Sequence, residues 1–246
     1  MAHLATERAN NLMLKKLYIN GDSHTAGTYN SPDNFENCFA GLLARKYNLN
    51  YNNHAVKGGS NPRIIRTSKE YLEHENPKET VVLIGWSDSA RTEWLIKDKW
   101  YQVANQHDYE ILENKYLNHV WRRYFESTFN KECDYVMLNR AIEQQYHILK
   151  FSKWLRTKGF RHLFLHGNES FFYKRSVFEI EWPDDVWLFN QPYNSTISFC
   201  RYCQSKNHQM DSHFHLDMSA HKDYADFIDS EFKKILIDNT SQQKLP

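Results

Sequence analysis

The sequence predicts an α/β fold of three layers, in which a parallel sheet of about five strands lies between two layers of helices. Two observations predict it. Segments of strand character alternate with turns and helical segments, which is typical of a parallel sheet covered on both faces by helices. Residues 80–85, Thr-Val-Val-Leu-Ile-Gly, form a continuous apolar and β-branched run, as expected of a central strand buried on both faces.

The amino-terminal half is expected to supply three strands and two helices. Residues 16–20 form a β-rich run that ends at a glycine, and residues 34–47 carry apolar side chains at helical spacing. A second short strand is expected over residues 51–55. It is followed by a turn over residues 57–62 and by a second helix, whose apolar residues are Ile64, Ile65, Tyr71 and Leu72.

The carboxyl-terminal half is expected to add two strands and two helices. Residues 141–158 have one apolar helical face and stop at Gly159. Residues 162–166, His-Leu-Phe-Leu-His, predict a fourth strand, and residues 184–189 predict a short fifth one. Residues 218–237 predict a closing helix with apolar side chains spaced for burial.

The chain of 246 residues is long enough for one large α/β domain or two small ones. A single domain over residues 1–246 is favoured, because no linker rich in Gly, Ser or Pro interrupts it. Residues 88–135 are less regular and rich in Trp, Tyr and charge, and we expect an insertion or lid there. Aromatic residues make up 15% of the chain. They either line a sugar-binding cleft or fill the core, and core filling is the favoured interpretation.

Charge and hydropathy exclude several classes of partner. The chain has 31 Lys and Arg against 30 Asp and Glu, so its balance gives no basis for binding nucleic acid or a membrane surface. The first twenty residues lack a secretory apolar core, and no later stretch approaches the roughly 18 apolar residues of a membrane span. We therefore expect a soluble, cytoplasmic protein. Reduced thiols are expected in its four cysteines, Cys38, Cys133, Cys200 and Cys203.

A candidate nucleophile lies directly after the first predicted strand, in the turn Gly21-Asp22-Ser23. Serine attacks poorly unless a general base lies within hydrogen-bond reach, and that base needs an orienting acid. Both residue types occur near the other end of the chain, in Asp211-Ser212-His213-Phe214-His215. The sequence thus contains the parts of a catalytic triad.

Two further loops follow predicted strands, Gly58-Gly59-Ser60-Asn61 and Gly85-Trp86-Ser87-Asp88. In an open parallel sheet, ligands bind outside the carboxyl ends of the strands. These loops and the Ser23 turn are therefore expected to meet at one edge of the sheet. The segment Asp211–His215 must reach the same edge for the chemistry to work.

With these blocks in this order, the chain resembles the SGNH, or GDSL-type, hydrolase family over nearly its whole length. The resemblance implies a flavodoxin-like fold, with Ser23 as nucleophile and as a backbone oxyanion donor, Gly58 as a second donor, and no cofactor. Ser87 stands where the family has an asparagine whose side-chain amide donates to the oxyanion. Either activity is weaker for this reason, or a neighbouring loop supplies the missing contact.

The last block also departs from the family's Asp-x-x-His spacing, because the two histidines follow Asp211 by two and four residues. His215 is favoured over His213 as the base, since it precedes His221 by six residues, as in the family's His-Pro-Ser-x-x-Gly-His continuation. Asp211 would orient the imidazole and stabilise its cation.

A rival constellation overlaps this block. The residues Cys200, Cys203, His208 and His213 have zinc-knuckle spacing and are ligand types that tetrahedral zinc prefers. Such a zinc would be structural and would leave His215 free as the base. A further alternative is a weakly active or inactive binding or structural protein of the same fold, which the departures at Ser87 and at the last block would explain.

The favoured hypothesis is a serine hydrolase that acts on a small-molecule or carbohydrate ester, as an esterase or a carbohydrate O-deacetylase, through an acyl-enzyme on Ser23. The polar, aromatic-rich texture and the Gly-Trp-Ser-Asp block are similar to GDSL-like proteins of bacteriophages. For a phage-encoded member, the host cytoplasm or the virion would be the expected location.

Overall fold

A parallel sheet forms the centre of the fold in the computed structural model. Its strands are β1 (Lys16–Asn20), β2 (Asn50–Asn53), β3 (Thr80–Trp86) and β6 (Arg161–His166), in the order β2-β1-β3-β6. Each neighbouring pair runs parallel. The structure describes residues 14–29, 34–103, 115–129, 134–168, 171, 179–213 and 215–237.

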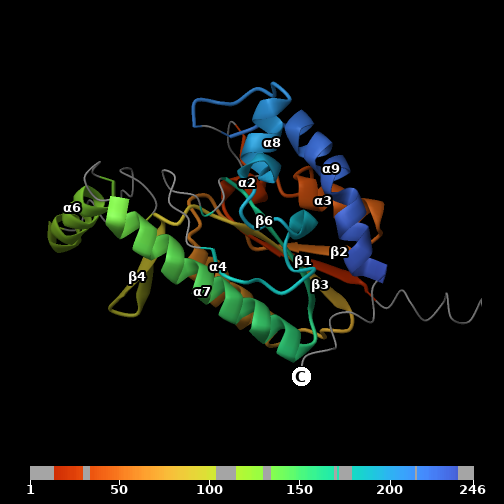
Figure 1. The fold of residues 1–246 in the computed structure, drawn as a ribbon, viewed down its shortest axis with the longest axis horizontal. Coiled ribbons are helices and arrows are strands. Elements are labelled where there is room, and N and C mark those ends of the chain that lie inside the picture. Colours follow the sequence, from red (N-terminus) through yellow and green to blue (C-terminus); the bar gives the residue numbers. More distant parts are fainter. Residues whose placement is uncertain are drawn as a thin grey trace, which may run out of the picture.

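Helices cover both faces of this sheet, so the predicted three-layer α/β/α architecture is confirmed (Figure 1). The chain passes from β1 through the single turn of α2 (Ser23–Ala26). One face of the sheet carries α4 (Asn61–Leu72) and α7 (Asp134–Lys158). The opposite face carries α3 (Phe39–Lys46), α8 (Phe199–Ser205) and α9 (Met218–Ile237).

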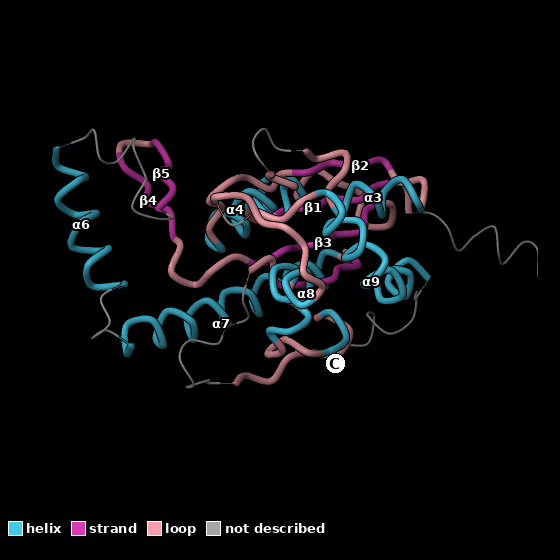
Figure 2. Tube along the Cα trace, turned by 90° about the horizontal axis from the view of Figure 1, so that it is seen from above, coloured by secondary structure: helices cyan, strands magenta, loops and turns pink. Residues whose placement is uncertain are grey.

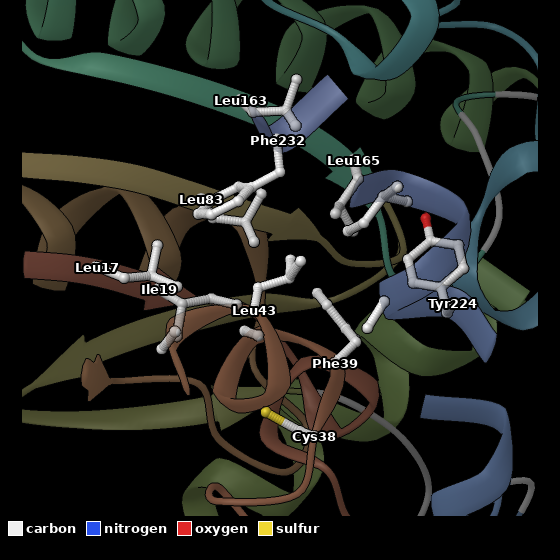
Figure 3. Close-up of a cluster of buried hydrophobic side chains, with 14 of the residues drawn as sticks. Leu17, Ile19, Cys38, Phe39, Leu43, Leu83, Leu163, Leu165, Tyr224 and Phe232 are labelled. Carbon is white, nitrogen blue, oxygen red and sulfur yellow. The ribbon is translucent and has the colours of Figure 1, made fainter. Parts of the chain in front are cut away.

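The apolar run of β3 explains why the sheet is buried on both sides. Successive side chains of a strand point to opposite faces. Val81 and Leu83 accordingly pack with the α3, α8 and α9 layer, where Phe232 is also buried (Figure 3). Val82 and Ile84 pack into a second core with α4 and α7. A continuous apolar strand is what a sheet between two helical layers requires.

The segment predicted as an insertion or lid contains a hairpin and a helix. The antiparallel strands β4 (Thr92–Ile96) and β5 (Lys99–Val103) are joined by Lys97 and Asp98. Both of these residues have positive φ, as a two-residue type I′ hairpin turn requires. Figure 2 shows the hairpin and α6 (Lys115–Phe129) at one end of the molecule.

The aromatic residues of this segment largely pack against one another. Together with Val103 and Leu117 they form a separate small core. Its aromatic members are Trp94, Tyr101, Trp121 and Tyr124. This arrangement agrees with the core-filling interpretation of the aromatic content. Tyr109 and Cys133 lie outside the described residues.

The predicted fifth strand over residues 184–189 is wrong. Trp187 makes only an isolated parallel bridge to Phe164 of β6, and Leu188–Asn190 form a 3₁₀ turn. Phe189 and Asn190 have φ of 53° and 55°, so the backbone leaves the extended conformation that a strand needs. The helix predicted over 34–47 begins later, at Phe39, and α7 begins earlier, at Asp134. The sequence did not predict α8.

Among the described helices, none combines the length and the apolar character that crossing a lipid bilayer demands.

Candidate active site

The site lies where the strand order reverses. From β1 the chain continues to β2 on one side, whereas β3 and β6 follow on the other. Such a switch point leaves a crevice outside the carboxyl ends of the two central strands. Ser23 follows β1 and Ser87 follows β3, so the topology places both residues at this crevice.

The Ser23 turn is held by the buried carboxylate of Asp22, which is the N-cap of α2. Its Oδ1 accepts the backbone N–H of His24 at 3.1 Å. A Cβ added to Gly167 would lie 2.8 Å from the same oxygen, so the loop after β6 must approach Asp22 without a side chain. Ser23 is 4% exposed, and its hydroxyl has no hydrogen-bond partner among the described residues. The turn is therefore fixed, while the hydroxyl keeps its hydrogen-bonding capacity.

Asp211 and His215 form a closed loop. The backbone N–H of Asp211 donates to the carbonyl of His215 at 2.9 Å, and Met210 bridges Leu216 in antiparallel fashion. The Asp211 carboxylate in turn accepts the backbone N–H of His215 at 2.9 Å on Oδ1 and its ring Nδ1–H at 3.3 Å on Oδ2. This loop geometry lets an acid and a histidine four residues apart contact one another.

His24 connects this loop to the Ser23 turn. Its ring lies edge-on to the ring of His215, with centroids 5.9 Å apart. Because His24 is the residue after Ser23, the late imidazole and the early hydroxyl belong to the same part of the molecule. His24 itself is buried, and its Nδ1 has no partner within the described part of the chain.

Burial is the main cause that lowers the pKa of His215 from its usual 6.5, and the Lys57 ammonium lowers it further. The carboxylates of Asp211 and Asp22 act in the opposite direction. A carboxylate can only accept, so Nδ1 of His215 carries the proton of the Asp211 contact. Nε2 is then the basic nitrogen. His215 is thus held neutral, in the tautomer that a general base needs.

His213 occupies a different environment. Its side chain is exposed, and its ring centroid lies 6.4 Å from that of His215. Its backbone N–H donates to Asp211 Oδ1 at 2.8 Å, which helps to close the loop. In this geometry the contact of His213 with Asp211 is made by its backbone.

The glycine pair after β2 forms a tight turn. The N–H of Gly59 donates to the carbonyl of Val56 at 3.0 Å, and Gly58 has φ of 73°, which favours glycine. The carbonyl of Gly21 accepts the N–H of Val56 at 3.2 Å, so the segment before the turn is hydrogen-bonded to the segment that leads to Ser23. The N–H of Gly58 has no acceptor among the described residues.

Ser87 is held by hydrogen bonds to two residues that were not expected at the site. Its backbone N–H donates to Asn61 Oδ1 at 2.7 Å, and its hydroxyl accepts from Arg91 Nη1 at 3.0 Å. The same Nη1 donates to Asp22 Oδ2 at 3.3 Å. Asn61 lies in the glycine-rich turn of the sequence, but no local pattern marks Arg91, because its partner Asp22 is 69 positions away.

The four residues of the predicted zinc site do not form a ligand set. Within the described residues, no group of three or more His, Cys, Asp or Glu side chains is placed to hold a metal ion. Both ring nitrogens of His208 are engaged, with Ser219 at 3.0 Å and Asp223 at 3.0 Å. Cys200 and Cys203 are buried in the core against α9. The spacing reflects one buried face of α8 and not a metal site.

Comparisons with known proteins give a family and a fold. A family model described as "Family of unknown function (DUF6071)" matches residues 23–179. No curated protein matches the sequence. The crystal structure of TesA superposes with a TM-score of 0.51 at 11% identity, and the match covers 90% of this chain and 99% of that one. At this identity the likeness shows the fold alone, and this fold is that of SGNH-type hydrolases.

Two further solved structures are similar at lower scores. The psychrotrophic esterase EstA from Pseudoalteromonas sp. is 14% identical, with a TM-score of 0.48 and coverage of 91% of this chain and 100% of that one. A member of the lipolytic protein G-D-S-L family from Veillonella parvula DSM 2008 is 12% identical, with a TM-score of 0.43 and coverage of 89% and 99%.

Proposed function

This chain belongs to the DUF6071 family, a family of unknown function, and from the geometry of its site we propose that it is a serine hydrolase that cleaves ester bonds. The observation that carries the proposal is the buried Asp211–His215 pair, which lies against the Ser23 turn through His24. An acid–imidazole pair that reaches the hydroxyl of such a serine would activate it as a nucleophile.

The proposed reaction has two steps. Ser23 Oγ attacks the ester carbonyl while His215 Nε2 takes its proton, and the leaving alcohol departs with that proton. Water then attacks the acyl-enzyme, and His215 again takes and returns the proton, which releases the acid and regenerates the Ser23 hydroxyl. Asp211 stabilises the imidazolium that forms in both steps. The backbone N–H groups of Ser23 and Gly58 donate to the oxyanion.

For the substrate we propose a small-molecule or carbohydrate ester. Support comes from a cavity of about 190 Å³. Trp187, which lines it, stacks on His166 at the end of β6, and the next residue, Gly167, touches the Asp22 turn. Aromatic faces combined with polar groups suit a sugar ring. The cavity is lined by Ile180, Trp182, Pro183, Asp184, Trp187, Asn190, Pro192 and Tyr193.

The buried thiols of Cys38 and Cys203, which form no disulfide within the described part of the chain, support a reducing compartment such as the cytoplasm as the place of action.

Hydrolysis of p-nitrophenyl acetate tests the proposed activity. We expect Ser23→Ala to abolish turnover and to lose fluorophosphonate labelling, which mass spectrometry would locate at Ser23 in the parent. Ser212→Ala changes an exposed serine two residues before Phe214 and serves as the matched control. Equal rates in the parent and Ser23→Ala would reject the hydrolase proposal.

The substrate class needs a separate measurement. Trp182→Ala is expected to raise KM for an O-acetylated oligosaccharide and to leave the kinetics with p-nitrophenyl acetate within about threefold of the parent. An equal effect on both substrates, or none on the oligosaccharide, would contradict a sugar-binding role for the cavity.

A further inference from the structure

Arg91 lies at the proposed active site without an assigned role. It follows β3, and its Nη1 donates to Ser87 Oγ at 3.0 Å and to Asp22 Oδ2 at 3.3 Å. The Asp22 side chain is fully buried, whereas that of Arg91 is 19% exposed. The guanidinium thus spans the two loops that follow the central strands, on a side chain that is partly exposed.

Its position relative to Ser23 follows from the neighbours of that serine. Asp22, immediately before Ser23, is bonded to Arg91. His24, immediately after Ser23, packs against His215. The guanidinium therefore contacts the residue before the nucleophile, and the imidazole packs against the residue after it.

The guanidinium also lies directly against the short side chain at position 87. Serine ends at Oγ, and Arg91 Nη1 lies 3.0 Å from that atom. Arginine has five N–H donors. Nη1 serves Ser87 and Asp22, while Nη2 and Nε have no acceptor among the described residues. The buried Asp22 carboxylate fixes the position of the guanidinium. The remaining N–H groups of Arg91 can therefore donate to an acceptor atom of the substrate.

We propose that the Arg91 guanidinium is the third oxyanion donor of this site, replacing the side-chain amide that Ser87 cannot supply. The inference rests on the proposed hydrolase function. As the bond from Ser23 Oγ to the carbonyl carbon forms, the π electron pair moves onto the carbonyl oxygen, where Arg91 donates together with the backbone N–H groups. When this electron pair returns to re-form the carbonyl, the bond to the leaving alcohol breaks, and His215 gives the alcohol oxygen its proton.

The rival explanation is that Arg91 only neutralises the buried Asp22. An unpaired buried carboxylate is costly, so Arg91→Ala alone would not separate the two roles. Asparagine keeps the N-cap function of Asp22 without its charge. The double variant Asp22→Asn/Arg91→Ala therefore has no buried carboxylate to neutralise, but it still lacks the proposed oxyanion donor.

The experiment measures kcat and KM for p-nitrophenyl acetate, with thermal unfolding of each variant. Arg91→Ala is expected to lower kcat by about 10²–10³-fold, with KM changed less than kcat. Asp22→Asn/Arg91→Ala should stay equally slow. Ser87→Asn added to Arg91→Ala should restore at least about tenfold, because asparagine brings back a neutral amide donor. Arg45→Ala, an exposed position on α3, is the matched control.

Recovery of parental kcat in Asp22→Asn/Arg91→Ala would overturn the proposal, since Arg91 would then serve Asp22 alone. Arg91→Ala within threefold of the parent would also overturn it, provided that Ser23→Ala is inactive; the hydrolase function would then stand without this donor. If Ser23→Ala keeps the parental rate, the hydrolase function fails and the Arg91 proposal fails with it.

Discussion

The ring of His24 meets the ring of His215 edge-on at 5.9 Å, and this contact joins the first strand–turn unit to the last loop before α9. Through it the nucleophile candidate near one end of the chain and the Asp211–His215 pair near the other share one buried environment.

The two late histidines are expected to differ in their effect on catalysis. His215→Ala removes the buried base and should lower kcat for p-nitrophenyl acetate by on the order of 10³-fold or more. His213→Ala changes an exposed ring and keeps the backbone N–H that bonds Asp211, so its kcat should stay within about threefold. The reverse ranking would assign the base to His213.

The pH dependence of kcat/KM is expected to report His215. Since its pKa lies below 6.5, activity should persist below that pH and fall on further acidification as the imidazole becomes charged. Asp211→Asn removes a carboxylate that raises this pKa, so the acid limb should move to lower pH while kcat falls. Asp226→Asn, an exposed change on α9, is the control. A limb that moves to higher pH in Asp211→Asn would contradict the assignment.

Folding stability is expected to decrease in acid because three histidines are buried neutral. Burial lowers the pKa of His162 and His166 to about 4 and that of His221 to about 3. The unfolded chain binds these protons first, near pH 6.5, so stability is complete above that pH and decreases below it. The slope is up to about 1.4 kcal/mol per pH unit for each group.

Urea unfolding between pH 7.5 and 4.5 measures this slope. His221→Asn keeps an acceptor for the Phe39 N–H, which bonds His221 Nδ1 at 3.3 Å, but it cannot titrate. The pH slope of its free energy of unfolding should therefore correspond to the uptake of about one proton fewer than in the parent. A slope identical to that of the parent would show that His221 does not titrate on unfolding.

The core between the sheet and α9 is expected to be sensitive to lost volume. Phe232 is fully buried there (Figure 3), and Phe232→Ala should lower the free energy of unfolding by about 3–5 kcal/mol. Ile237, on the same helix, is 57% exposed, so Ile237→Ala should stay within about 0.5 kcal/mol. Comparable losses in the two variants would place Phe232 outside the stabilising core.

The sequence by itself determined the elements whose signals are local. The apolar run at 80–85 gave a central strand, because burial on both faces requires apolar side chains at successive positions. The limits of β1 and α9 also agree with those predicted, and the apolar side chains of α9 recur at the helical period of 3.6. The same patterns, with the Gly-Asp-Ser turn, predicted a parallel α/β fold. The element at 184–189 failed because an apolar stretch does not reveal a backbone that turns to positive φ.

Only the tertiary structure decided which polar groups meet. The contact of Arg91 with Asp22 joins residues 69 positions apart, and no periodicity connects them. Cys200 and Cys203 have metal-ligand spacing, yet the packing of α8 turns both into the core. Asp211 and His215 meet at an unfamiliar spacing because their loop closes on itself. Side-chain pairing depends on how strands and loops are placed in space, and a linear pattern does not contain that information.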